Sequence, residues 1–186
     1  MTFDWLPLQG ACLITLDPKI DHRGYFMRAY DQSAFAKHDL QTSWVQENES
    51  LTRQPETVRG FHFQYPPHSE TKLVRVTAGR ALDVIVDVRK GSPTFGKHIA
   101  VELSATNHKM LYVPKGFAHG CCALEPDTLF HYMVDEPYCR EAEGGLRWDD
   151  PTVAVPWPTK NPVVSDKDML LPLLGDCKSV DFALAR

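Results

Sequence analysis

Residues 57–77 gather side chains that could bind an anionic small molecule and exchange a proton with it. The charged and polar members are interleaved with apolar residues, and they are Arg59, His62, Gln64, His68, Glu70, Lys72 and Arg75. Arginine and lysine attract anions, and an imidazole, with a reference pKa of about 6.5, can take up and return a proton at neutral pH. The stretch therefore predicts a small-molecule site, with a solvated hairpin carrying ordinary surface charges as the alternative.

The spacing within residues 58–64 is close to the alternation of a β-strand, in which successive side chains point to opposite faces. This pattern places Arg59 on the same face as Phe61 and Phe63. It places His62 and Gln64 on the other face. We therefore expect Arg59 and His62 to point in opposite directions.

The segment Pro114-Lys-Gly-Phe-Ala-His119 resembles the second motif of the cupin barrels, in which a Pro–Gly turn aims a histidine into the barrel. In metal-binding cupins an earlier motif supplies His-x-His and a nearby glutamate. The matching place here reads His62-Phe63-Gln64, and a neutral amide is a poor ligand for a transition metal. We therefore expect no metal and no cofactor. The alternative is a metal-dependent cupin oxygenase or isomerase, with the ion held by His62, His68, Glu70 and His119.

The bulk composition is that of a globular protein, with 43% hydrophobic and 24% charged residues. A length of 186 residues fits one domain, 1–186, with a loop-rich tail from about residue 137. The net charge of −4 and the lack of a basic block argue against nucleic acid as a partner. No stretch approaches the roughly 18 apolar residues of a membrane helix, and the start lacks the pattern of a secretory signal. The five cysteines are odd in number and form no CxxC pair, so we expect a cytoplasmic protein.

Short apolar runs separated by proline and glycine predict eight to ten strands and one or two short helices. The best helix candidate is 31–39, with Asp31 or Ser33 as N-cap, and Ser165 could cap a second helix. A turn is expected over 114–120, ending on His119, with a strand after it. This pattern is typical of an all-β fold, an antiparallel jelly-roll barrel, and its many strand edges favour a homodimer formed by strand pairing.

Several longer sequence motifs resemble those of one known family. They are Asp21-His-Arg-Gly24, Gln46-Glu-Asn48, Arg59-Gly-Phe-His-Phe-Gln64, Lys72-Leu-Val-Arg75, Val113-Pro-Lys-Gly-Phe-Ala-His-Gly120 and Ser165-Asp-Lys-Asp168. From about residue 10 to 170 the chain is similar, in register, to the dTDP-4-dehydrorhamnose 3,5-epimerases, a family of metal-free cupins. The resemblance implies epimerisation at C3 and/or C5 of a nucleotide-linked 4-keto-6-deoxyhexose. The most direct case is conversion of dTDP-4-dehydro-6-deoxy-D-glucose to dTDP-4-dehydro-L-rhamnose.

The resemblance also implies catalytic roles. His62 matches the base that removes a proton alpha to the ketone, and Tyr132 matches the acid that returns one on the opposite face. Lys72 is expected to stabilise the enolate oxygen or to contact the sugar. Asp168 matches the carboxylate that pairs with the base, and Asp83 is an alternative partner. Such an inversion is redox-neutral, so no cofactor is implied.

The remaining matches are substrate contacts. Arg23 and Arg59 match contacts to the diphosphate, for which a guanidinium fork is suited. Contacts to the sugar or the nucleotide are implied for Gln46, Glu47, Asn48, His119, Tyr138, Glu143 and Lys167, with Tyr138 where an aromatic ring can stack on the base.

Two positions depart from the family pattern. Arg28 stands where the family usually has a nucleotide-contacting glutamate, in Gly-Phe-Phe-x-Glu. Glu70-Thr71-Lys72 replaces the family's Gln-Gly-Lys. These departures leave open a related nucleotide sugar as substrate, or inversion at one carbon only.

Overall fold

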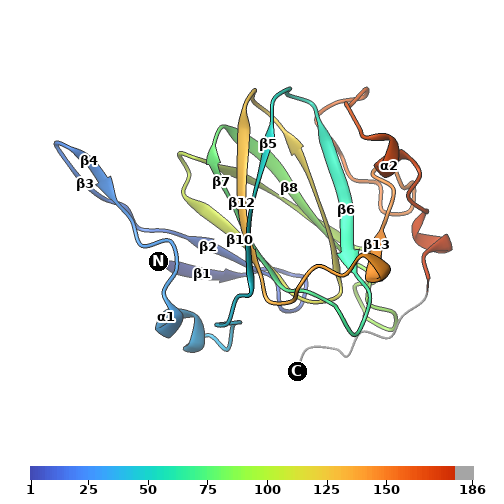
Figure 1. The fold of residues 1–186 in the computed structure, drawn as a ribbon, viewed down its shortest axis with the longest axis horizontal. Helices are drawn as coiled ribbons and strands as arrows, with labels where there is room; N and C mark the ends of the chain where they lie inside the picture. Colours follow the sequence, from blue (N-terminus) through green and yellow to red (C-terminus); the bar gives the residue numbers. More distant parts are fainter. Residues whose placement is uncertain (179–186) are drawn as a thin grey trace.

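The computed structural model describes residues 1–178, and two antiparallel β-sheets face each other across its centre (Figure 1). The first sheet has the order β1-β2-β10-β7-β12-β5, formed by Thr2–Trp5, Cys12–Thr15, Lys109–Val113, Lys72–Ala78, Thr128–Val134 and Gln46–Thr52. The second has the order β13-β6-β11-β8-β9, formed by Glu143–Gly145, Val58–Gln64, Phe117–Ala123, Arg80–Asp87 and His98–Ser104. The predicted all-β jelly-roll barrel is confirmed. Residues 179–186 of the predicted domain lie outside the described residues.

Apolar side chains of both sheets fill the interior of the barrel. Val74 and Leu111 come from the first sheet, and Ile85, Leu103 and Phe117 come from the second. Each of the five is at most 2% exposed. Removing apolar surface from water contributes roughly 25 cal/mol per Å², so this shared core holds the two sheets together.

The C-terminal segment covers the outer side of the second sheet. Leu146 and Val153 pack there against Phe61 and Phe63 of β6. A parallel bridge between Thr57 and Val163 then brings the chain back along β6. The loop-rich tail predicted from about residue 137 therefore completes a second apolar cluster and supplies one wall of the site described below.

A β-bulge in β6 changes which way its side chains point. His62 pairs with His119 of β11, but Arg59 pairs with Cys121, so the register shifts between them. Gly60 lies at the shift with a φ of +103°. A Cβ at Gly60 would lie 2.6 Å from the carbonyl oxygen of His119, so only glycine fits there. The bulge overturns the predicted alternation, because Arg59 and His62 line the same cavity.

The helices are short and have side-chain caps. Helix α1 spans Gln32–Ala36, and the Asp31 carboxylate accepts hydrogen bonds from the backbone N–H groups of Ser33 and Ala34. Helix α2 spans Asp166–Met169, and the Ser165 hydroxyl accepts one from Asp168. Both confirm the predicted caps. Single 3₁₀ turns add Arg140–Ala142 and Leu174–Asp176. Within residues 1–178, no helix has the length and apolar character needed to cross a membrane.

One hairpin projects from the barrel (Figure 1). It consists of β3, Lys19–Asp21, and β4, Gly24–Phe26, and the two strands pair only with each other within the described chain. Ile20, Tyr25 and Phe26 are 78%, 58% and 70% exposed. Strand β4 ends at Phe26, and no other strand within residues 1–178 pairs with this hairpin.

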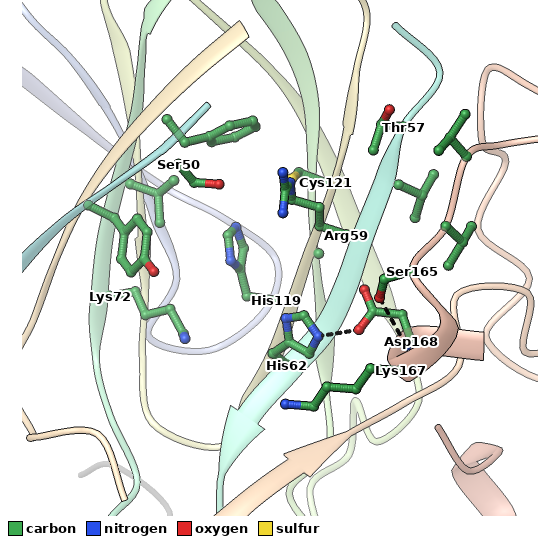
Figure 2. A pocket seen from close by; sticks show the side chains of 17 residues that line it. Ser50, Thr57, Arg59, His62, Lys72, His119, Cys121, Ser165, Lys167 and Asp168 are labelled. Atoms are coloured by element: carbon green, nitrogen blue, oxygen red, sulfur yellow. Dashed lines mark hydrogen bonds and ion pairs between the residues drawn. The ribbon is translucent and has the colours of Figure 1, made fainter. Parts of the chain in front are cut away.

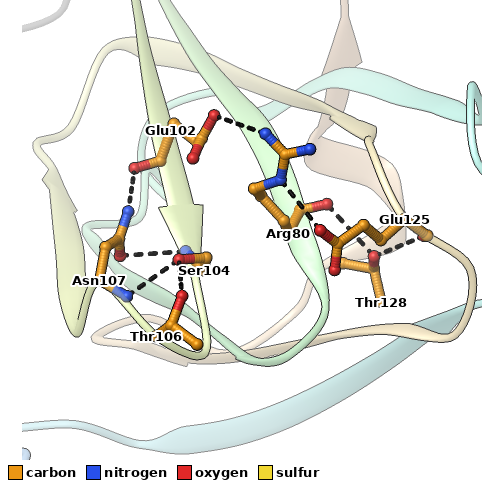
Figure 3. Close-up of polar contacts among 7 residues, drawn as sticks. All are labelled: Arg80, Glu102, Ser104, Thr106, Asn107, Glu125 and Thr128. Atoms are coloured by element: carbon orange, nitrogen blue, oxygen red, sulfur yellow. Dashed lines mark hydrogen bonds and ion pairs between the residues drawn. The ribbon is translucent and has the colours of Figure 1, made fainter.

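Polar contacts join β8, β9 and the turn before β12 at one end of the barrel (Figure 3). Arg80 donates from Nη1 to Glu102 and from Nε to Glu125, each over 3.1 Å. The Thr128 hydroxyl donates to the main-chain oxygens of Arg80 and Glu125. The charged side chains are more than 40% exposed, so solvent screens these ion pairs and each contributes little to stability.

The turn expected over 114–120 is shorter than predicted. Strand β11 begins at Phe117, so His119 lies inside the strand instead of at the end of a turn. Residues 117–123 are nearly all buried, and such a run carries no alternation that would mark its start.

Candidate active site

A cavity of about 520 Å³ opens between the two sheets (Figure 2). Its walls include Arg59 and His62 from β6, His119 from β11, and Lys72 and Tyr132 from β7 and β12. A second cavity of about 540 Å³ shares His62, Lys72 and Tyr132 with the first. Together the two cavities offer room for a ligand larger than a single sugar.

His62 and Asp168 form a hydrogen-bonded pair at this site (Figure 2). His62 Nε2 lies 2.7 Å from Asp168 Oδ1, and the backbone N–H of Gly60 donates to Asp168 Oδ2 over 3.0 Å. The Asp168 side chain is 6% exposed, whereas that of His62 is 46% exposed. Burial by itself raises the pKa of Asp168, but the hydrogen bonds from His62 and Gly60 outweigh it and lower the pKa below its usual value.

His119 has a carboxylate partner of its own. Its Nε2 lies 2.8 Å from Oδ1 of Asp83, which is fully buried. The other oxygen, Asp83 Oδ2, has no hydrogen-bond partner within the described residues. Of the two carboxylates considered as partners of His62, Asp168 is therefore the one in contact, and Asp83 holds His119.

Tyr132 and Lys72 lie on the wall opposite His62, because β12 and β7 belong to the first sheet and β6 belongs to the second. Burial raises the pKa of the Tyr132 phenol, the negative charge of Glu70 raises it further, and Arg59 lowers it. The phenol therefore stays protonated at neutral pH. Lys72 Nζ lies 2.5 Å from Glu70 Oε1, and both side chains are 11% exposed.

Arg59 is held in place by the neighbouring strand β5. Its Nε donates to the Thr52 hydroxyl over 3.0 Å, and its Nη2 donates to the Leu51 carbonyl oxygen over 3.3 Å. The guanidinium is thus oriented within the first cavity, where it can donate hydrogen bonds to an anion.

The second cavity brings together most of the other predicted binding residues. They are Gln46 and Asn48 of β5 with Tyr138, Glu143 and Lys167 of the tail. Gln46 Oε1 accepts from the Tyr138 backbone N–H over 2.9 Å, and Lys167 Nζ donates to both oxygens of Glu143. The hydrogen bond from Lys167 lowers the pKa of Glu143.

Three predicted binding residues do not reach either cavity in this chain. Glu47 points to the other face of β5, where it pairs with His131, because alternate residues of a strand face opposite ways. Arg23 is 78% exposed on the projecting hairpin and pairs with Asp21. Arg28 lies beside α1 in a separate cavity of about 410 Å³. One protomer by itself therefore does not bring these three residues to the cavities, and their predicted contacts with the substrate stay predictions.

Gln64 occupies the position of the second histidine of metal-binding cupins and binds loops instead. Its Oε1 accepts from the Cys139 backbone N–H over 2.6 Å, and its Nε2 donates to the His68 and Pro137 carbonyl oxygens. Within residues 1–178, no group of three or more His, Cys, Asp or Glu side chains is arranged to hold a metal ion.

Several lining residues carry no signal in the sequence. The first cavity is also lined by Ser50, Thr57, Cys121, Phe130, Val163 and Val164. Val163 and Val164 belong to the tail and reach the cavity only through the bridge to Thr57. Glu70, which the sequence placed in the candidate site and offered as a metal ligand, lines the second cavity and pairs with Lys72.

Comparisons with known proteins identify the family. A model of the dTDP-4-dehydrorhamnose 3,5-epimerase family matches residues 5–176. A dTDP-4-dehydrorhamnose 3,5-epimerase of Sinorhizobium fredii is 48% identical over 175 residues, which cover 94% of this chain and 90% of that protein.

Solved structures of similar proteins support the same family assignment. The dTDP-4-dehydrorhamnose 3,5-epimerase of Bacillus anthracis, with TDP and PPi bound, matches with a TM-score of 0.90 at 42% identity, over 92% of this chain and 98% of that one. A 3,5-epimerase of Legionella pneumophila in complex with dTDP-4-keto-L-rhamnose matches with a TM-score of 0.92 at 31% identity. The match covers 97% of this chain and 98% of that one. The chain therefore belongs to the dTDP-4-dehydrorhamnose 3,5-epimerase family, and it is an isomerase that acts as a carbohydrate epimerase.

Proposed function

We propose that this chain inverts C3 and C5 of a nucleotide-linked 4-keto-6-deoxyhexose, converting dTDP-4-dehydro-6-deoxy-D-glucose to dTDP-4-dehydro-L-rhamnose. The hydrogens at C3 and C5 are both alpha to the C4 carbonyl, so removing either one gives an enolate. Returning a proton to the opposite face of that enolate inverts the carbon. The reaction needs a base, an acid on the other side of the sugar and a group that stabilises the oxyanion.

The observation that carries this proposal is the placement of His62 and Tyr132 on opposite walls of one cavity. In this mechanism His62 accepts the alpha proton, and Asp168, 2.7 Å away, stabilises the imidazolium that forms. The Lys72 ammonium stabilises the enolate oxygen. The Tyr132 phenol, which remains protonated because burial raises its pKa, returns a proton to the other face.

Substrate binding in this proposal uses both cavities. Arg59 contacts the diphosphate and His119 supports the sugar, since both line the first cavity. Gln46, Asn48, Glu143 and Lys167 contact the nucleotide and sugar from the second. Tyr138, 58% exposed, stacks on the base.

Solvent deuterium exchange tests the reaction. Purified enzyme and the dTDP-linked 4-keto sugar in D₂O are expected to yield product labelled at both C3 and C5, read by proton NMR. Label at one carbon only would identify a single-centre epimerase. No exchange with any of a panel of 4-keto nucleotide sugars would overturn the proposal. Activity that is lost on dialysis against a chelator and restored by a metal would favour the metal-dependent cupin instead.

Two variants assign the base and the acid. His62→Ala is expected to lower exchange at both carbons by about 10²-fold or more, the usual contribution of a general base. Tyr132→Phe is expected to retain exchange but lose inversion at one carbon, because protons still leave while none is returned from the opposite wall. Unchanged product from Tyr132→Phe would remove that residue from its role.

We also infer a homodimer in which Arg23 of one protomer reaches the substrate of its partner. Arg59 is the single arginine lining either cavity among residues 1–178. The hairpin that carries Arg23 projects from the barrel and exposes Tyr25 and Phe26, as an interface segment does.

We also infer a cytoplasmic location. It is supported by the cysteines, all five of which are free thiols.

A further inference from the structure

Glu70 is a partly buried acid within the site that the mechanism above does not use. It lies just before β7 and lines the second cavity together with Lys72 and Tyr132. Its side chain is 11% exposed, and an acid with so little access to water needs partners for its charge.

Protein donors engage both oxygens of the Glu70 carboxylate. Lys72 Nζ lies 2.5 Å from Oε1, and Gln64 Nε2 donates to Oε2 over 3.3 Å. Gln64 is itself fixed by the backbone groups of His68, Pro137 and Cys139. The carboxylate is therefore held by Lys72 of β7 and by Gln64 of β6, whose amide is in turn fixed by two loops, and turning it would break both of its hydrogen bonds.

This anchoring matters because a lysine ammonium sits on a flexible four-carbon stem. Holding one of its three N–H donors at Glu70 restricts the rotamers of Lys72 and leaves the other two donors for the cavity. Glu70 also faces Tyr132, whose pKa is raised by burial, then by Glu70 and Cys121, and lowered by Arg59.

We propose that Glu70 is a positioning residue: held by Gln64, it fixes the Lys72 ammonium beside the place where the enolate oxygen forms. It sets the rate of proton removal without contacting the reacting carbons. This role rests on the proposed epimerase function. The string Glu70-Thr71-Lys72 departs from the family's Gln-Gly-Lys, so the ion pair that holds Lys72 is a feature of this chain, and Glu70→Gln returns the position to the family's neutral residue.

The test compares Glu70→Gln and Glu70→Asp with wild type. Glu70→Gln keeps the shape of the side chain but removes its charge, so kcat is expected to fall by about 10- to 100-fold, as for loss of a charge-assisted hydrogen bond, with KM changed by less than about 3-fold. Glu70→Asp retains the charge and is expected to recover part of the lost kcat, and it serves as the folded variant should Glu70→Gln fail to fold.

Glu136→Gln is the matched control. Glu136 pairs with His68 over 3.5 Å, so this variant removes a charge from the neighbouring loop without touching Lys72. It is expected to keep the wild-type kcat. A kcat for Glu70→Gln equal to that of Glu136→Gln would overturn the positioning role.

Two readouts do not depend on activity. A crystal structure of Glu70→Gln is expected to show Lys72 displaced from its wild-type position. Ultraviolet titration, with the signal assigned by a Tyr132→Phe background, is expected to show Tyr132 ionising at lower pH in Glu70→Gln. An undisplaced Lys72 and an unchanged Tyr132 titration would overturn the inference.

The two proposals can fail separately. Absence of exchange in the wild type would defeat the epimerase function, and the Lys72 position and the Tyr132 titration would then decide whether Glu70 positions these groups. Exchange in the wild type with an unaffected Glu70→Gln would defeat the inference alone.

Discussion

At the scale of single residues, each histidine in the cavity has a carboxylate partner, but the two pairs are built differently. Asp83 and His119 lie on adjacent strands, β8 and β11, and their side chains meet within one sheet. Asp168 reaches His62 from α2, across 106 positions of sequence. The Gly60 N–H holds the second oxygen of Asp168, so the carboxylate is aimed at the imidazole before any substrate binds.

Asp168→Asn tests this pairing. The amide retains the shape of the side chain but cannot stabilise an imidazolium by charge, so exchange at both carbons is expected to fall by about 10²- to 10⁴-fold. Proton NMR in D₂O measures the loss. Asp166→Asn, in the same helix but outside the cavities, is the control and is expected to keep wild-type exchange. Equal rates in the two variants would contradict the role of Asp168.

At the scale of elements, the bulge in β6 decides the composition of the site. Its extra residue rotates the strand between Arg59 and His62, so both line the cavity although their spacing is three. Phe61 meanwhile turns outward and packs with the tail. One glycine thus allows a single strand to supply both an anion contact and a base.

Gly60→Ala should remove this arrangement. The added Cβ would meet backbone atoms of β11 at 2.6 and 2.8 Å, and the φ of +103° disfavours any side chain. Strain of about 1–3 kcal/mol from the backbone and a similar amount from overpacking predict a loss of about 2–6 kcal/mol in unfolding free energy, measured by urea denaturation. Gly175→Ala, where a Cβ meets nothing within 4 Å, should change stability by less than about 1 kcal/mol.

A buried ion pair closes the end of β8. Asp87 and Arg89 are both fully buried, and Arg89 donates from Nε and Nη2 to the two oxygens of Asp87 over 2.9 and 2.8 Å. Burial raises the pKa of Asp87, but the hydrogen bonds from Arg89, Ser92 and Thr94 outweigh it, and the pKa lies below 3.8. The loop that follows β8 is thereby tied to the barrel.

The lowered pKa of Asp87 gives a pH dependence with a definite sign. The stability that Asp87 contributes to the fold is present above 3.8, its pKa in the unfolded chain. It is lost as the pH falls through the lower pKa of Asp87 in the folded chain. Asp87→Asn leaves Arg89 buried without its partner and is expected to cost about 3–5 kcal/mol at pH 7. Urea denaturation should show this difference shrinking below pH 4, and a difference that grows there would contradict the assignment.

At the scale of the whole molecule, the projecting hairpin leaves one chain without the diphosphate contact predicted for Arg23. The hairpin makes no strand pair with the barrel within residues 1–178, and it exposes Ile20, Tyr25 and Phe26. A two-fold partner would cover these apolar side chains and receive Arg23 at its own cavity. In the proposed dimer, each substrate site is therefore completed by Arg23 of the other protomer.

Mixed dimers test the shared site. Arg23→Ala alone is expected to lower kcat/KM by about 10- to 100-fold through loss of a phosphate contact. Refolding Arg23→Ala together with His62→Ala should restore about a quarter of the wild-type activity, because half of the dimers are mixed and each holds one intact site. A mixture of His62→Ala and Lys72→Ala, whose residues belong to the same chain's cavity, is the control. Equal activity in the two mixtures would contradict the shared site.

The sequence by itself determined the fold class, both helix caps, and the charged residues and the tyrosine of the first cavity. These features depend on local patterns: strand alternation, turn residues, and motifs such as that ending at His119. The family resemblance placed His62, Lys72 and Tyr132 in one site, and the structure brings them together.

Only the tertiary structure decided how these residues are oriented and paired. Strand alternation predicts faces correctly until a bulge intervenes, which is why Arg59 was placed on the wrong side. The choice of Asp168 over Asp83 depended on where α2 packs, and the role of Gln64 depended on loops that reach it from residues 68 and 137–139. Contacts between segments so far apart in sequence follow from strand register and loop path, which local patterns do not encode.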